Sequence, residues 1–204
     1  MDSTDADRTT RLALAFEGAL GISAMLIGWL VGHWPLVGVS FVDEEARRQV
    51  MAVGWGLVAT GPLLVVLFLC ERFPVGPLRQ VQEMTAHVVL RMFGGATSGQ
   101  LFVVALAAGI GEELLFRGLV QSGMARLLSD WPGQVTALVV ASALFGICHW
   151  LNSTYAILAM LAGAYFGLLL ILTGNVLTPI TAHAVYDFLA LVYLIRPQSL
   201  VGSD

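Results

Sequence analysis

Residues 101–117 read LFVVALAAGIGEELLFR, eleven apolar or glycine residues followed by two glutamates, three apolar residues and an arginine. The segment is otherwise typical of a membrane-spanning helix, and it continues to Leu128. Each ionisable group inside such a segment costs about 2.5–3.5 kcal/mol on insertion scales. We therefore expect Glu112, Glu113 and Arg117 to have partners within the protein and a function.

The composition indicates an integral membrane protein. The chain has 204 residues, of which 57% are hydrophobic and 12% are charged, and its mean hydropathy is +0.82. A soluble domain carries about twice that share of charged residues. The net charge of −4 lies in tails and loops rather than in a basic patch, so the expected environment is the lipid bilayer and no nucleic-acid partner is expected. The oligomeric state is left open.

The hydropathy pattern predicts an all-α, polytopic transmembrane helical bundle. About 20 apolar residues suffice to cross the hydrocarbon core of a bilayer, and about six segments qualify. Between the second and third of these, apolar residues at three- and four-residue spacing predict an interfacial amphipathic helix over residues 74–98. Residues 1–10 are expected to form a polar tail without structure, and Glu17 is expected at the membrane interface. The predicted spans are 12–34, 51–69, 101–128, 135–150, 155–173 and 176–195.

The arginines in the flanking segments predict a cytoplasmic N-terminus. The positive-inside rule places the side that is richer in arginine in the cytoplasm. In this orientation the inner segments hold Arg8, Arg11, Arg72, Arg79, Arg91 and Arg196, whereas the outer segments hold Arg47, Arg48 and Arg126.

Helix geometry separates the two adjacent glutamates. Successive residues of an α-helix are about 100° apart, so Glu112 and Glu113 cannot point the same way. Glu113 and Arg117 are four residues apart with the acid first, which favours an ion pair on one helix face. Glu112 is five residues from Arg117 and must find its partners on other helices.

Two further apolar segments each carry a histidine. His149 follows Phe145 by four residues, and His183 precedes Asp187 by four, so each pair shares a helix face. In spans that are otherwise apolar these faces should point inward, toward Glu112.

Such a group has two chemical uses. Glu112, His149 and His183 could bind a divalent metal such as zinc with a position open for water. Alternatively, Glu112 could act without a metal as a general base on water while the histidines polarise the carbonyl. Both lead to hydrolysis of an amide bond near or within the bilayer.

A non-catalytic membrane scaffold is the alternative prediction, since Glu113 and Arg117 alone would be a structural pair. The spans also present a geometric difficulty. His149 falls near the end of the fourth span and His183 near the start of the sixth, and these spans run parallel. Either the boundaries differ by several residues, or Pro179 kinks the last span.

Three motifs carry a resemblance to a known family. The motifs are E-E-x-x-x-R at Glu112–Arg117, F-x-x-x-H at Phe145–His149 and H-x-x-x-N/D at His183–Asp187. Their order and spacing resemble those of the CAAX prenyl protease and bacteriocin-processing (CPBP) family of intramembrane proteases.

The resemblance implies an intramembrane endopeptidase. Glu112 would activate water, His149 would be a second catalytic or metal-binding group, and His183 and Asp187 would support the tetrahedral intermediate. The family is described both as metalloproteases and as metal-independent glutamate proteases. CAAX proteases have asparagine where this chain has Asp187, and an ionised aspartate has no hydrogen to donate. Asp187 is therefore expected to orient His183, to bind metal or to stay protonated.

The resemblance also divides the chain into parts. Residues 1–98 would be a variable N-terminal part, residues 99–196 the catalytic core and residues 197–204 a polar tail. The expected substrate is a peptide or a membrane protein, and the expected location is a bacterial inner membrane. A bacteriocin-immunity protein without catalysis is the alternative that the resemblance adds.

Overall fold

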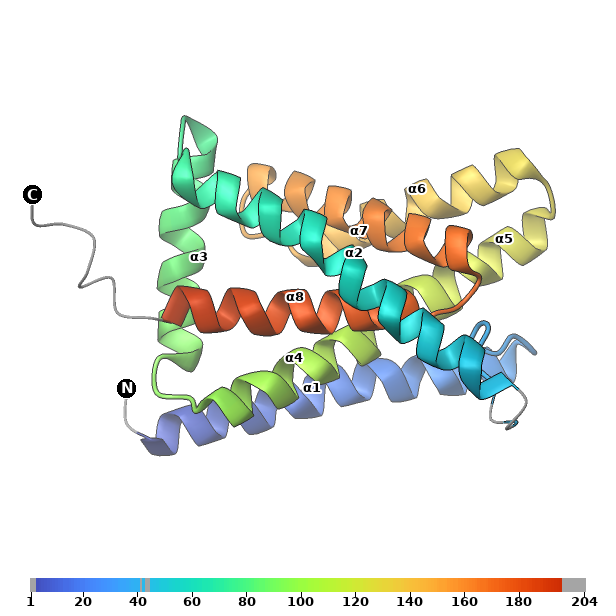
Figure 1. Cartoon of the computed structure of the whole chain (residues 1–204), viewed down its shortest axis with the longest axis horizontal. Coiled ribbons are helices and arrows are strands. Elements are labelled where there is room, and N and C mark those ends of the chain that lie inside the picture. The colour runs from blue at the N-terminus through green and yellow to red at the C-terminus, as the bar shows by residue number, and fades with distance from the viewer. Residues whose placement is uncertain (1–2, 41, 43–44, 196–204) are drawn as a thin grey trace, which may run out of the picture.

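The computed structural model describes residues 3–40, 42 and 45–195. This part of the chain is helical with no strand, which confirms the all-α prediction (Figure 1). The predicted polar tail at 197–204 lies outside the described residues. The helices are α1 (Ser3–Leu30), α2 (Ala46–Arg72), α3 (Pro77–Phe93), α4 (Ser98–Glu113), the π-helix η2 (Leu114–Gln121), α5 (Ser122–Leu128), α6 (Trp131–Cys148), α7 (Ser153–Thr173) and α8 (Leu177–Ile195).

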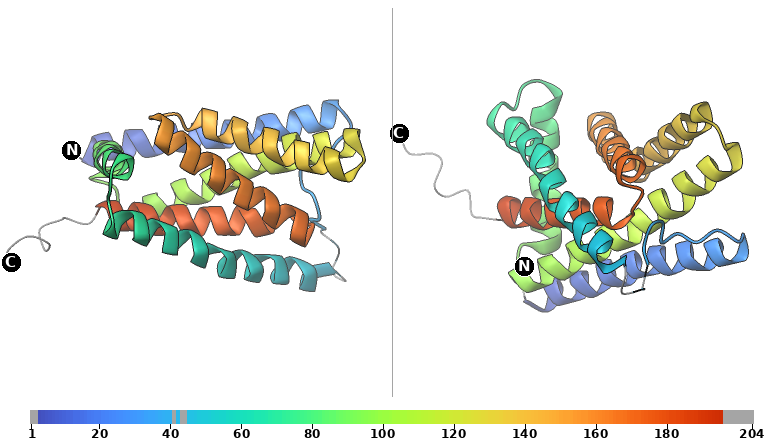
Figure 2. Two further views of the ribbon diagram at one scale, coloured as in Figure 1. Left: turned by 90° about the horizontal axis from the view of Figure 1, so that it is seen from above. Right: turned by 45° about the vertical axis from the view of Figure 1, so that its right-hand side comes forward.

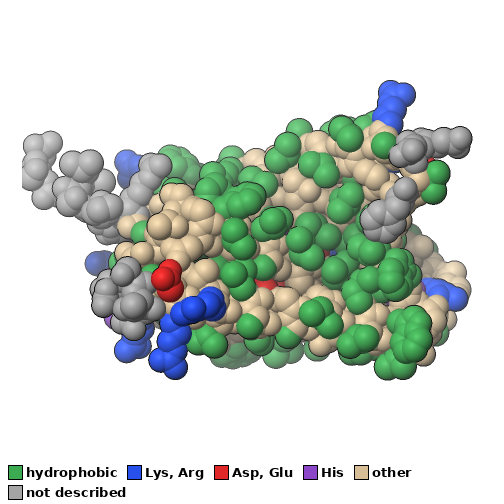
Figure 3. Space-filling view, turned by 90° about the horizontal axis from the view of Figure 1, so that it is seen from below, with side chains coloured by type: hydrophobic (Ala, Val, Ile, Leu, Met, Phe, Trp, Pro, Cys, Tyr) green, Lys and Arg blue, Asp and Glu red, His purple; other side chains and the backbone are tan. Residues whose placement is uncertain are grey.

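Five helices among the described residues, α1, α2, α6, α7 and α8, are long and apolar enough to cross a membrane. Their outer faces carry exposed large apolar side chains, among them Trp29, Val58 and Leu172. Apolar side chains cover the middle of the face shown in Figure 3, and arginines gather toward its two ends. This pattern is that of an integral membrane protein.

The predicted third span, 101–128, is helical throughout but is not a regular α-helix. It is divided among α4, η2 and α5, and together these run from one end of the molecule to the other (Figure 1). Two polar side chains of η2 bind carbonyl groups of α7: Arg117 donates to Gly163 at 2.8 Å and Gln121 donates to Gly167 at 3.0 Å. The wider turn of a π-helix, which is frequent at functional sites, accompanies these contacts.

The amphipathic helix α3 lies across the ends of the long helices, whereas α1, α2 and α8 run along the long axis (Figures 1 and 2). This is the placement expected of an interfacial helix. The prediction of an unstructured tail over residues 1–10 was wrong, because α1 begins at Ser3. Asp7 accepts a hydrogen bond from Gln100, which ties this first part of α1 to the start of α4.

Glycines on α4 allow close packing on two sides. A Cβ atom at Gly109 would lie 2.8 Å from the Cβ of Ala184 on α8, and one at Gly111 would lie 2.3 Å from the carbonyl oxygen of Glu17 on α1. The acidic end of α4 is therefore held directly between α1 and α8. The predicted boundary at residue 98 coincides with the start of α4, but α1 and α2 pack against α4 and α8 across it.

Candidate active site

Glu112 lies near the end of α4 with 9% of its surface exposed. Its Oε2 atom is buried without a hydrogen-bond partner among the described residues, and it lies 3.6 Å from Nε2 of His149. The other ring nitrogen of His149, Nδ1, lies 2.8 Å from the carbonyl oxygen of Phe145. Because a carbonyl only accepts, Nδ1 carries the hydrogen. In a neutral His149, Nε2 then presents its lone pair beside the Glu112 carboxyl.

Glu113 belongs to a row of ionisable side chains on the other side of α4. One of its oxygens, Oε1, lies 3.1 Å from Nη1 of Arg117 and 2.8 Å from Nδ1 of His183. The second nitrogen of His183, Nε2, lies 3.3 Å from Oδ2 of Asp187. Both nitrogens of His183 thus face carboxyl oxygens, and Glu113 is a partner of His183 as well as of Arg117.

Aromatic rings pack around these ionisable side chains. Phe145 is almost fully buried; its ring stacks on His149 at a centroid distance of 4.3 Å, and the guanidinium carbon of Arg117 lies 4.5 Å from it. Phe166 on α7 stacks on His183 at 4.7 Å. Such contacts fix the orientation of both imidazoles.

Phe145 links the two histidines. Its ring stacks on His149 and lies 5.9 Å from the ring of His183, so the F-x-x-x-H and H-x-x-x-D motifs meet at this point. Phe145 is the fifteenth residue of α6 and His183 the seventh of α8, and eight residues correspond to about 12 Å of helix. The helix α6 therefore has more residues before this meeting point than α8 has, and in this sense the two helices are staggered. Pro179 lies in the first turn of α8, where proline is tolerated, so no kink is needed.

The structure brings all six predicted site residues together but divides them into two groups. Glu112 faces His149, whereas Glu113 and Arg117 join His183 and Asp187. Within the described part of the chain, no three His, Cys, Asp or Glu residues are arranged to hold a metal ion. Since both nitrogens of His183 are engaged by carboxyls, the predicted metal ligands do not fit a common ion in this arrangement.

Sequence reasoning gave no site role to Phe145, Phe166 or Glu17. The phenylalanine of the F-x-x-x-H motif was a usable signal for Phe145, whereas nothing in the sequence links Phe166 or Glu17 to the site. Glu17 contacts Gly111 through its backbone. It therefore lies beside the site, near the middle of the apolar stretch Ala6–Leu30 rather than at its start.

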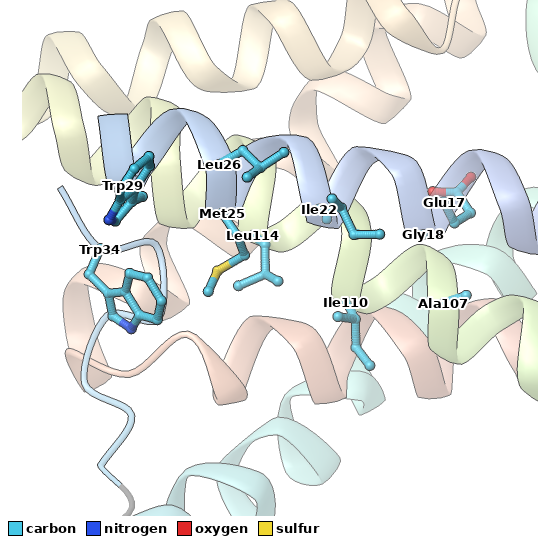
Figure 4. Close-up of a pocket in the computed structure, with 12 residues that line it drawn as sticks. Glu17, Gly18, Ile22, Met25, Leu26, Trp29, Trp34, Ala107, Ile110 and Leu114 are labelled. Carbon is cyan, nitrogen blue, oxygen red and sulfur yellow. The ribbon is translucent and has the colours of Figure 1, made fainter. Parts of the chain in front are cut away.

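An apolar groove of about 590 Å³ lies between α1 and the segment of α4 and η2. Among the described residues that line it, Glu17 is the only ionisable one; it lies at one end, and Trp29 and Trp34 lie at the other end (Figure 4). Ile110 and Leu114 form part of its wall. The groove thus runs past the turn of α4 that carries Glu112.

Comparison with known families identifies the segment that holds these site residues. Residues 95–189 match the family model described as type II CAAX prenyl endopeptidase Rce1-like. The match covers all three motifs and α4 through most of α8, and it confirms the resemblance to the CPBP family. No curated protein and no solved structure matches the chain.

Proposed function

Because residues 95–189 match the family model described as type II CAAX prenyl endopeptidase Rce1-like, we propose that this membrane protein hydrolyses peptide bonds with a water activated by Glu112. The observation that supports this proposal most strongly is the position of Glu112. A buried carboxyl with a free oxygen, 3.6 Å from an imidazole nitrogen, is the arrangement that a general base and its partner require.

The proposed first step is a proton transfer from water to Glu112. A water beside Oε2 of Glu112 and Nε2 of His149 donates one hydrogen toward each acceptor. As Glu112 takes its proton, the water oxygen bonds to the carbonyl carbon and the π electrons move to the carbonyl oxygen. Glu112 then returns the proton to the departing amine as the carbon–nitrogen bond breaks.

His183 and Asp187 support this reaction from α8 in our proposal. Asp187 lies at one ring nitrogen of His183 and Glu113 at the other, so the ring is held in one orientation. A carboxylate that orients a histidine is a common arrangement in catalytic sites. We assign this orienting role to Asp187.

A divalent metal such as zinc bound by Glu112, His149 and His183 stays a prediction that elemental analysis tests. The mechanism above uses no step through a metal, because the donors do not converge on one point in this arrangement. Stoichiometric zinc in the purified, active protein would contradict that mechanism.

We propose a peptide segment or a membrane protein as the substrate, a bacterial inner membrane as the location and a cytoplasmic N-terminus. A reporter fused before Ser3 tests the orientation. The function itself is tested by hydrolysis of internally quenched peptides by the purified full chain in detergent, compared with Glu112→Gln. Turnover that Glu112→Gln removes supports the peptidase. A well-folded protein without turnover on any peptide would favour the non-catalytic scaffold or immunity protein.

A further inference from the structure

Glu17 lies outside the matched segment, on α1, at the point where α1 packs against the end of α4 that carries Glu112. Its backbone contacts Gly111, the residue before Glu112. Its Oε2 atom is buried and has no hydrogen-bond partner within the described residues. Burying a polar atom without a partner costs free energy, so this carboxyl calls for a role.

The charges around the site indicate the state of Glu17. The acids are Glu17, Glu112, Glu113 and Asp187, and the groups that carry or accept a positive charge are Arg117, His149 and His183. The proposed reaction uses a neutral His149, which leaves Arg117 and a protonated His183 as two cations for four acids; even with both imidazoles protonated, four acids would face three cations. At least one acid must therefore keep its proton, because an uncompensated buried charge is costly.

Glu17 is the acid that best fits this description. Glu112 has His149 as a neighbour, Glu113 has Arg117 and His183, and Asp187 has His183. None of the ion pairs formed by the described residues includes Glu17. A neutral carboxylic acid has an O–H group to donate.

The reaction also needs such a donor. Negative charge builds up on the carbonyl oxygen during attack, and donors aimed at that oxygen stabilise it. An ionised Asp187 cannot supply a hydrogen. We propose that Glu17 is a further catalytic residue, a neutral carboxylic acid whose O–H hydrogen-bonds to the carbonyl oxygen of the substrate.

This inference rests on the proposed peptidase function and adds no co-reactant. Glu112 still takes the proton from water and returns it to the amine. The Glu17 hydrogen strengthens its bond to the oxyanion and stays on Glu17 when the carbonyl re-forms. The N-terminal helix thereby completes the site built by the matched segment.

Two substitutions of similar size separate donation from packing. Glu17→Gln keeps a neutral donor in the same place, whereas Glu17→Met keeps the length and removes the donor. Loss of one such donor typically costs about 10²–10³ in kcat, which we expect for Glu17→Met with little change in KM. Glu17→Gln should stay within about tenfold of wild type. Asp7→Asn, an acid on the same helix that binds Gln100, is the matched control and should be unaffected.

Turnover of Glu17→Met equal to wild type would overturn the inference, as would an equal loss in Glu17→Gln and Glu17→Met. Infrared spectroscopy gives a readout that does not depend on activity. A protonated carboxyl band should be present in the full chain, weaker in Glu17→Gln and unchanged in Asp7→Asn. An unchanged band in Glu17→Gln would show that Glu17 is not the neutral acid. A wild-type chain without turnover would contradict the proposed function, and the band would still decide the state of Glu17.

Discussion

The imidazole of His183 lies 2.8 Å from the carboxyl of Glu113, a residue 70 positions earlier in the chain. Glu113 is completely buried, and it also pairs with Arg117. One carboxyl therefore satisfies the buried arginine and holds a histidine of the site. The second glutamate of the E-E-x-x-x-R motif joins the packing of η2 to the orientation of His183.

Replacing Glu113 by glutamine should reduce both stability and turnover. The change leaves Arg117 as an uncompensated buried charge, which typically costs about 3–5 kcal/mol, and it replaces the charged acceptor of His183 Nδ1 by a neutral amide. Arg117→Gln should cause a similar loss of stability. The measurement is thermal unfolding in detergent, together with turnover of the folded fraction.

The double variant Glu113→Gln/Arg117→Gln distinguishes a true pair from two independent sites. If the two residues are partners, its loss of stability is smaller than the sum of the single losses. Arg126→Gln serves as a control, since Arg126 is exposed and donates a hydrogen bond to the carbonyl of Gly32. Strictly additive losses would contradict the pairing.

Gly109→Ala should disturb the site without touching a charged group. The added Cβ would lie 2.8 Å from the Cβ of Ala184 and 2.9 Å from its backbone nitrogen, so α4 and α8 must move apart beside the Glu113–His183 contact. Overpacking of this kind typically costs about 1–3 kcal/mol.

A second glycine provides the comparison for this change. A Cβ atom added at Gly54 on α2 would have no neighbour within 4 Å. Gly54→Ala should therefore leave turnover unchanged, and stability should stay the same or rise slightly. Melting temperature and kcat of the two variants are the measurements. Equal behaviour of Gly109→Ala and Gly54→Ala would refute the close approach of α4 and α8.

Asp187→Asn should lower turnover. Asparagine keeps the size of the side chain but loses the charge that faces Nε2 of His183, 3.3 Å away. Turnover is measured between about pH 6 and pH 8, where an unperturbed histidine titrates. If position 187 serves only as a hydrogen-bond donor, Asp187→Asn should equal or exceed wild type over that range, and the orienting role would be wrong.

Local spacing was sufficient to predict much of this site. The four-residue separation of Glu113 and Arg117 indicated their pairing, and the apolar periodicity placed α3 as a separate amphipathic helix. Both depend on interactions within one helix, which a sequence displays directly.

The relative positions of the helices could not be predicted from the sequence. The stagger of α6 against α8 depends on where each helix begins, and a motif does not record that. The π-helix η2 accompanies hydrogen bonds that Arg117 and Gln121 donate across the bundle to carbonyl groups of α7, and the sequence of one segment does not show such partners. Glu17 is a lone acid within the apolar part of α1, residues 12–30, and only its contact with Gly111 reveals its place.

Turnover of Glu112→Gln tests the central claim most directly. Glutamine keeps the shape of residue 112 but cannot accept the proton of water, and loss of a general base commonly costs about 10²–10⁴ in rate. The account predicts such a loss, with a melting temperature close to that of wild type because Glu112 has no hydrogen bond at Oε2 to lose. Near-normal peptide hydrolysis by folded Glu112→Gln would contradict it.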